Sequence, residues 1–389
     1  MNLVTPIFKE DIELRISRIA TALKVMGVDA ILLSTNANIY YTCGRVFAGY
    51  TFITADGDTT YFVRRPVGLE GDNVVYVRKP EQITGAVKAY PKSIAIELDG
   101  CSYNEAMRLK NVFPEARMEN ASNIMRAIRA RKTDFEIEMI KSSAAPHMEA
   151  YKHIPELFHR GMTDLEMHIA IEHKMRSLGC IGQFRINGQS MEFYSGNVLT
   201  GDNADSPTPY DFAMGGAGQC PSLPVGANGT EIREGNSLMV DMGGNFNGYM
   251  ADITRSFKLG KISDLAMKAH HTSIEICRLV AEHARPGVMA KELYAIAIEK
   301  AKAEGLEDYF MGHRQQAGFI GHGVGIEVNE APVLAPKSKD MIEQGNIIAV
   351  EPKFVIPGVG AVGVENTYAV LDSHTQLLSP ITEEMIDLE

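Results

Sequence analysis

The first 130 residues alternate between helical and strand-like patterns of apolar positions. Apolar side chains recur at the spacing of one amphipathic helix: Ile12, Ile16, Ile19, Leu23 and Met26. Three strand-like runs follow, DAILLS, YTFITADGDTTYFV and SIAIELDG, and the second predicts a hairpin that turns at residues 55–58. Strands that alternate with helices predict a three-layer α/β domain over residues 1–130.

After a basic linker, RAIRARKTD, the pattern changes to longer helical segments and two pairs of apolar strands. Two capping-box pairs predict helix starts: Thr133 with Glu136, and Thr163 with Glu166. Further helical periodicity covers roughly residues 263–285 and 290–304. Helices beside antiparallel strand pairs predict an α+β domain over residues 131–389.

The first strand pair, MVDMGGNFNGYMADITRSF, carries one aspartate in each apolar arm. If the turn centres between Phe246 and Asn247, Asp241 and Asp252 lie directly opposite each other. If it centres on Asn247-Gly248, the dipeptide preferred in tight turns, they lie diagonally on the same face. Either register brings the carboxylates within roughly 5–8 Å, which is destabilising unless a cation lies between them. A solvated hairpin with two surface acids is the competing interpretation.

The second strand pair, VEPKFVIPGVGAVGVENTYAV, repeats this arrangement near the end of the chain. Its midpoint at Gly358 sets Glu351 opposite Glu365. Buried carboxylates are costly unless they are paired or coordinated. The sequence offers no matching set of four basic residues beside these four acids, so metal ions are the expected counter-charge.

A histidine, His322, lies in the glycine-rich segment FIGHGVGIEV, where the backbone can approach a ligand closely. One imidazole and four carboxylates suit Mn, Co, Fe or Zn. Five ligands are more than one metal ion needs if it is to keep a coordination position open. Two divalent ions roughly 3.5–4 Å apart, with a water or hydroxide between them, would use all five, and such a pair promotes hydrolysis.

The order of the five candidate ligands resembles that of the creatinase/prolidase/methionine-aminopeptidase family, whose fold is called pita-bread: Asp241, Asp252, His322, Glu351 and Glu365. The strings DMGGNFNGYMADITR, GHGVGIEVNE, VEPKF and GVENTY carry the resemblance over roughly residues 131–389. The segment RISRIATALKVMGVDAILLSTNANIYYTCG is similar to the amino-terminal domain of prolidases, aminopeptidases P and creatinases. The resemblance implies a creatinase-like three-layer α/β domain, then an α+β pita-bread catalytic domain with an antiparallel sheet.

The resemblance also implies a role for each ligand. Asp241 and Asp252 are expected to bind one metal ion, and His322 and Glu351 to serve the other. Glu365 is expected to bridge the ions together with Asp241. Glu351 and His322 are the expected catalytic residues, with Glu351 as the base that accepts a proton from the attacking water. Creatinase lacks these ligands, so their retention argues against creatine hydrolysis.

Three positions depart from the prolidase and aminopeptidase P pattern. No histidine occurs between His173 and His270, where those enzymes carry one in a PHG-like string. Asn329 stands where they carry a second histidine, and Gly363 where they often carry an arginine. Asn329 can donate a hydrogen bond but cannot shuttle a proton at neutral pH. We therefore expect a substrate pocket that differs from that of an ordinary prolidase.

The candidate substrate contacts are Asn329, Thr254 and Tyr210. Thr254 shares a strand face with Asp252, which predicts either a hydroxyl that supports the ligands or a threonine chosen for β-propensity. A loop over residues 184–226, rich in Gly, Ser, Asn, Asp and Pro, is expected to line the pocket or to be a plain surface excursion. Asp202 and Asp205 are weaker candidates for substrate contact. His313 could replace one of the missing histidines or be an ordinary surface histidine.

Composition favours a cytoplasmic enzyme. The first residues include no apolar signal segment, and no apolar run approaches the ~18–20 residues that span a bilayer. The five cysteines are scattered without C-x-x-C spacing, as is typical of reduced thiols. A net charge of −11 argues against nucleic acid as a partner. The family resemblance implies a homodimer.

These observations predict a dinuclear-metal-dependent hydrolase that cleaves small peptides near their amino terminus, as an Xaa-Pro dipeptidase or aminopeptidase does. Hydroxide bridging two metal ions would attack the scissile carbonyl, and Glu351 would pass the proton to the leaving amine. A metal-dependent hydrolase or lyase of a small non-peptide metabolite is the first alternative, favoured by the missing histidines and arginine. A non-catalytic peptide-binding module is the second.

Overall fold

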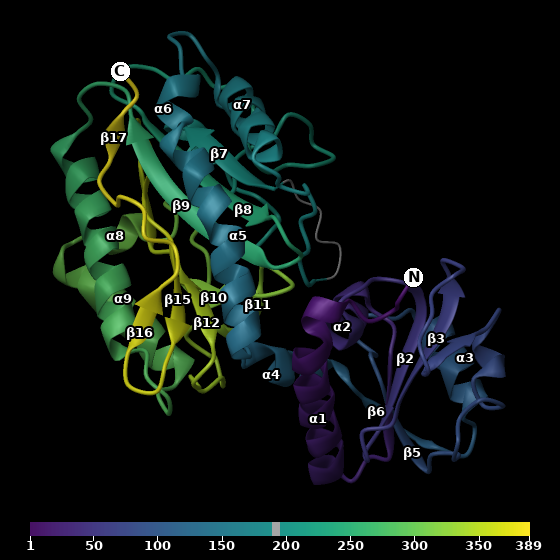
Figure 1. Cartoon of the computed structure of the whole chain (residues 1–389). Helices are drawn as coiled ribbons and strands as arrows, with labels where there is room; N and C mark the ends of the chain where they lie inside the picture. Colours follow the sequence, from purple (N-terminus) through teal and green to yellow (C-terminus); the bar gives the residue numbers. More distant parts are fainter. Residues whose placement is uncertain (189–194) are drawn as a thin grey trace. The chain divides into compact units, whose positions relative to one another are not determined.

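The computed structural model describes residues 1–188 and 195–389 and divides into two compact units, Met1–Arg129 and Ala130–Glu389 (Figure 1). Residues 189–194, part of the loop predicted at 184–226, lie outside the described residues.

The amino-terminal unit is built on a six-stranded sheet with the order β4-β3-β2-β1-β5-β6. Its strands are β1 Ala30–Leu33, β2 Ala48–Thr54, β3 Thr59–Arg65, β4 Val74–Tyr76, β5 Ser93–Ile96 and β6 Arg117–Asn120. Its helices are α1 Lys9–Met26, α2 Asn36–Cys43, α3 Tyr103–Val112 and α4 Ser122–Ala130, which ends at the boundary. The β2–β3 ladder closes at Ile53 opposite Thr59, which confirms the predicted hairpin.

Helices cover both faces of this sheet, which makes the three layers that the alternating pattern predicts. On one face Leu109 of α3 packs with Leu32 of β1. On the other face Ile39 of α2 packs with Val63 of β3.

Helix α1 confirms the predicted amphipathic helix and buries four of its five periodic apolar positions: Ile12, Ile16, Ile19 and Leu23. The fifth, Met26, is 46% exposed. The reason is local, because the helix ends there and the chain turns away through Gly27 in the left-handed conformation.

The helices of the carboxy-terminal unit are α5 Asp134–Lys152, α6 Ile154–Leu157, α7 Asp164–Ser177, α8 Asp264–His283 and α9 Ala290–Ala303. Two of them, α5 and α7, begin where their capping boxes predict. Both predicted capping boxes are present, with reciprocal bonds between Thr133 and Glu136 and between Thr163 and Glu166. Helices α8 and α9 confirm the helical periodicity at 263–285 and 290–304.

The strands of this unit form a four-stranded sheet, a five-stranded sheet and a two-stranded ribbon, ordered β17-β9-β8-β7, β11-β10-β12-β15-β16 and β13-β14. The first sheet contains β7 Gly196–Thr200, β8 Ser237–Asn245, β9 Met250–Lys258 and β17 Ile386–Asp387. The second contains β10 Gly321–Gly323, β11 Glu330–Val333, β12 Ile347–Val350, β15 Asn366–Val370 and β16 Thr375–Leu377. The ribbon is β13 Lys353–Ile356 with β14 Gly360–Gly363. Apart from the parallel β9–β17 pair, these pairings are antiparallel.

Helices pack on these strands from both sides, as Figure 1 shows for α5 and α8. Helix α5 packs on β8 and β9, where Tyr151 lies in one apolar cluster with Val240 and Ile253. Helix α8 packs on β13 and β14, where Cys277 lies in a second cluster with Phe354. No helix in the described part of the chain is long and apolar enough to cross a membrane.

The first metal-candidate hairpin is β8–β9, and its register decides between the two turns that the sequence left open. Asn245 pairs with Met250, so the turn centres on Asn247-Gly248. Asp241 therefore lies opposite Thr254, and Asp252 lies diagonally from it on the same face.

The second hairpin keeps the predicted register but is divided into two ladders. Val350 pairs with Asn366 in one, and Lys353 pairs with Gly363 in the other. Both ladders turn about Gly358, so Glu351 and Glu365 lie opposite each other at the break between them.

An isolated β-bridge joins the two hairpins beneath the four acids. Thr254 and Glu365 pair antiparallel, and the Glu365 N–H donates to the Thr254 carbonyl at 3.0 Å. The buried Arg255 guanidinium donates to the carbonyl oxygens of Thr254 at 2.7 Å and Glu365 at 2.8 Å. This junction fixes the backbone beneath the carboxylates.

Candidate metal centre

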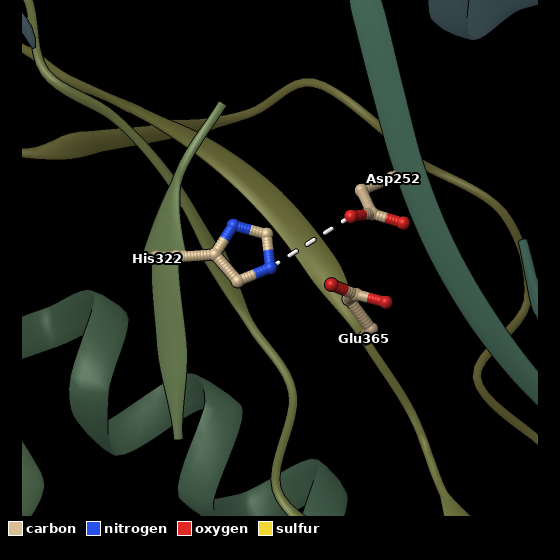
Figure 2. A group of neighbouring side chains, drawn as sticks. All are labelled: Asp252, His322 and Glu365. Carbon is tan, nitrogen blue, oxygen red and sulfur yellow. Dashed lines mark ion pairs between the residues drawn. The ribbon is translucent and has the colours of Figure 1, made fainter. Parts of the chain in front are cut away.

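Three of the five predicted ligands form a compact group. One ligand atom each from Asp252, His322 and Glu365 lies within 4.8 Å of the other two. Figure 2 shows the side chains converging from three segments: Asp252 from β9, His322 from β10, and Glu365 from the stretch before β15. The His322 Nε2 atom lies 3.8 Å from Asp252 Oδ2. Two carboxylates and one imidazole at this spacing suit one divalent transition-metal ion.

A lysine absent from the predicted site residues lies among the other carboxylates. Lys353 Nζ lies 2.7 Å from Asp241 Oδ2 and 2.7 Å from Glu351 Oε2. It lies 4.0 Å from Glu365 Oε2, and its side chain is fully buried. The expectation that only metal ions balance the four acids is therefore incomplete, because the Lys353 ammonium lies beside three of them. The sequence contained a signal for this contact. Lys353 stands two residues after Glu351, and this spacing puts two side chains on the same face of an extended chain.

The hydroxyl of Thr254 supports the same carboxylates from below. Its Oγ1 lies 2.9 Å from Asp241 Oδ1 and 2.8 Å from Glu365 Oε2. Thr254 is fully buried, so its hydroxyl is engaged with the acids rather than facing a substrate.

The polar atoms that remain open identify where an ion fits. Within the described residues, Glu365 Oε1 is buried and has no hydrogen-bond partner. The Nδ1 atom of His322 lies 3.1 Å from the Gly323 carbonyl oxygen, and this contact leaves Nε2 facing the acids. A buried carboxylate oxygen without a partner is costly unless something binds it. One ion beside Asp252, His322 and Glu365 fits these donors.

A second ion at Asp241 and Glu351 does not fit the residues as they stand. Both Asp241 oxygens are occupied, one by Lys353 and the other by Thr254. Glu351 binds Lys353 through Oε2, and its Oε1 lies 3.3 Å from His322 Nε2. The bridging role of Asp241 with Glu365 stays a prediction; both carboxylates contact the Thr254 hydroxyl, at 2.9 and 2.8 Å.

Burial and close charges shift the pKa values of the centre in opposite directions. Burial raises the pKa of Asp252 to about 7. Burial, with the charges of Asp252 and Glu351, raises the pKa of Glu365 well above its usual range. Burial alone would raise the pKa of Glu351, but the charge of Lys353 and the contact with His322 lower it to about 2. Burial alone would lower the pKa of His322, but Glu351 raises it to about 9.

The candidate substrate contacts lie elsewhere or hold the chain in place. The Asn329 side chain accepts from the Asn187 N–H and donates to the Asn187 carbonyl, both at 2.7 Å. It therefore fixes the start of the 184–226 loop. Tyr210 stacks on Phe212 and lines a small pocket that contains none of the five predicted ligands.

The three weaker candidates also make structural contacts. Asp202 accepts from the N–H of Gly358 at 2.9 Å and so supports the turn of the second hairpin. Asp205 accepts from His313 Nδ1 and from the Arg314 N–H, both at 2.9 Å. These bonds tie the described part of the predicted loop to its neighbours.

The glycine at 363 is explained by its surroundings. Gly363 has a φ of 145°, and a Cβ there would lie 2.7 Å from the Pro352 carbonyl oxygen. The backbone leaves no room for the arginine expected at this position.

Two family models match the chain, one over each unit. The model described as metallopeptidase family M24 matches residues 138–372, more than half of the chain. The chain belongs to metallopeptidase family M24. The creatinase/prolidase N-terminal domain matches residues 15–131, so this M24 member carries the amino-terminal domain that the resemblance implied.

Curated relatives and solved structures match this M24 member over nearly its whole length. An uncharacterised peptidase of Bacillus subtilis is 26% identical, covering 93% of this chain and 97% of its own. The Xaa-Pro dipeptidase of Pyrococcus furiosus is 24% identical, with 96% and 99% covered. The solved Xaa-Pro dipeptidase of Bacillus anthracis superposes with a TM-score of 0.79 at 23% identity, with 96% and 99% covered. The structural match confirms the predicted fold class.

Proposed function

We propose that this M24 member is a metal-dependent peptidase that cleaves small peptides near their amino terminus, with Xaa-Pro bonds as the first substrates to test. The observation that carries the proposal is the group of Asp252, His322 and Glu365, which presents open donors in a buried setting. The full-length likeness to a relative named Xaa-Pro dipeptidase supports the choice of substrate.

The residues around the group have distinct proposed roles. A divalent ion (Mn, Co, Fe or Zn) would polarise the scissile carbonyl and acidify a bound water. His322 is oriented for binding by its Gly323 contact. Glu351, whose Oε1 lies 3.3 Å from His322 Nε2, is the proposed base that takes a proton from the attacking water. Lys353 keeps this carboxylate ionised.

The direct test is hydrolysis of Xaa-Pro dipeptides and Xaa-Pro-Xaa tripeptides after loading with each of the four metals. Cleavage of dipeptides alone identifies a dipeptidase, and cleavage of tripeptides an aminopeptidase. Asp252→Asn should lose both the bound ion and the activity. Asp264→Asn, at the exposed start of α8, is the control and should keep both. Activity that survives in Asp252→Asn would contradict the proposed metal site.

A small non-peptide metabolite is the second candidate substrate. The side chain of Asn329 is bonded to the Asn187 backbone rather than open, and the arginine position is closed at Gly363. An ion-loaded protein that cleaves neither peptide class would favour this candidate. We also propose a homodimer, on the family resemblance alone, and light scattering of the purified protein tests it.

A further inference from the structure

The four carboxylates of the centre divide into two pairs with different partners. Asp241 and Glu351 each place one oxygen 2.7 Å from Lys353 Nζ. Their remaining oxygens contact Thr254 and His322. Asp252 and Glu365 group with His322; Glu365 Oε2 lies farther from Lys353 Nζ, at 4.0 Å, and Glu365 Oε1 is buried without a hydrogen-bond partner. One pair is therefore already bound by a cation, and the other is open to one.

The ammonium and a metal ion cannot share the first pair. A metal ion binds carboxylate oxygens at about 2.0–2.2 Å, so an ion at Asp241 and Glu351 would take the oxygens that Lys353 holds. The Lys353 ammonium would then either move away or lie close to the positively charged metal ion in a buried setting. The repulsion between these two charges would be strongly unfavourable.

The backbone of Lys353 limits how far its side chain can retreat. Its carbonyl accepts from the Met311 N–H at 2.7 Å, and its own N–H lies 3.4 Å from Met311 Sδ. Its register opposite Gly363 fixes the strand on the other side. The side chain is fully buried, so the ammonium meets the carboxylates and not water.

We propose that the Lys353 ammonium takes the place of one metal ion, so that the chain binds a single divalent ion beside a lysine that serves as the permanent second cation. The inference rests on the proposed function only for the first ion, at Asp252, His322 and Glu365. An ammonium has N–H donors and no lone pair to accept or coordinate with. Lys353 therefore offsets one of the two negative charges of Asp241 and Glu351 without adding an open coordination position.

The test counts metal ions in the full-length protein. The protein is saturated with Mn or Zn, passed through a desalting column and measured by elemental analysis, with binding isotherms in parallel. We expect one ion per wild-type chain. In Lys353→Ala the ammonium is gone and space opens between three carboxylates, so we expect two ions per chain. Lys132→Ala is the matched control, since Lys132 is also buried and pairs with buried Glu330 at 2.8 Å, and it should keep one ion.

Two ions in the wild type would overturn the inference, as would any result in which Lys353→Ala does not gain an ion. If Lys353→Ala fails to fold, anomalous diffraction from wild-type crystals soaked in Mn decides the question. One peak beside Asp252, with Lys353 still against Asp241, supports the inference, and two peaks overturn it. These readouts do not depend on substrate, so failure to cleave peptides would refute the proposed activity and leave the ion count standing.

Discussion

Replacing Thr254 by valine would remove one hydroxyl from beneath the metal centre and keep a β-branched side chain of similar shape. The Thr254 hydroxyl lies 2.9 Å from Asp241 Oδ1 and 2.8 Å from Glu365 Oε2. A hydroxyl has one proton, so it donates to one of the two carboxylates at a time. In the variant, both oxygens face a methyl group, and the buried Glu365 oxygen loses its donor.

The expected magnitude follows from the charge of the acceptor. A hydrogen bond to a charged group contributes about 1.5–3 kcal/mol, so Thr254→Val should lower the free energy of unfolding by about 2–3 kcal/mol. Thr272→Val is the control, because Thr272 is 3% exposed and donates to the neutral Lys268 carbonyl at 2.9 Å. Its loss should be about 0.5–1 kcal/mol. Urea denaturation followed by circular dichroism, with EDTA present, measures both variants.

Metal affinity gives a second readout that a purely structural threonine would not change. Groups that orient metal ligands typically alter affinity by about 10–100-fold when removed. We expect Thr254→Val to weaken binding of Mn or Zn by at least about tenfold, and Thr272→Val to leave it unchanged. Equal losses of stability in the two variants, together with unchanged metal affinity, would refute the reasoning and make Thr254 an ordinary strand residue.

Three further predictions test the centre. Glu351→Gln should lower kcat at least about 100-fold with KM little changed, because the proposed base is lost, and steady-state kinetics would expose a retained kcat as a contradiction. Metal binding should release about three protons at pH 6, since Asp252 (pKa about 7), His322 (pKa about 9) and Glu365, whose pKa burial raises well above its usual range, must lose theirs, so affinity rises as the pH rises. Calorimetry in buffers of different ionisation enthalpy measures this release, and none at pH 6 would count against these ligands. Asn329→Ala should raise KM and speed amide exchange at Asn187, and an unchanged exchange rate would show that the loop is held by other contacts.

Local sequence signals predicted the elements because each depends on neighbours a few residues away. The reciprocal bonds of Thr133 with Glu136 need only one turn of helix. The register of the second hairpin follows from a turn about Gly358, and the observed pairs keep it. For the first hairpin, local preference for Asn-Gly favoured the turn that the structure has, although the sequence left both registers open.

Local signals could not predict which carboxylates of the two hairpins lie next to each other. Spacing along the chain puts Asp241 near Asp252, but it says nothing about the distance from one hairpin to the other. The Thr254–Glu365 bridge sets that distance. It brings Glu365 of the second hairpin beside Asp252 of the first.

The sequence by itself determined the family, the two-part organisation and the five candidate ligands, because these are carried by residue type, order and periodicity. Only the tertiary structure decided how the charges are balanced. A lysine at position 353 could have pointed to solvent, as most lysines do. Burial of its strand, which is one arm of the second hairpin, leaves Lys353 no water to reach. The carboxylates of Asp241 and Glu351 become its partners because an unpaired buried charge is far more costly.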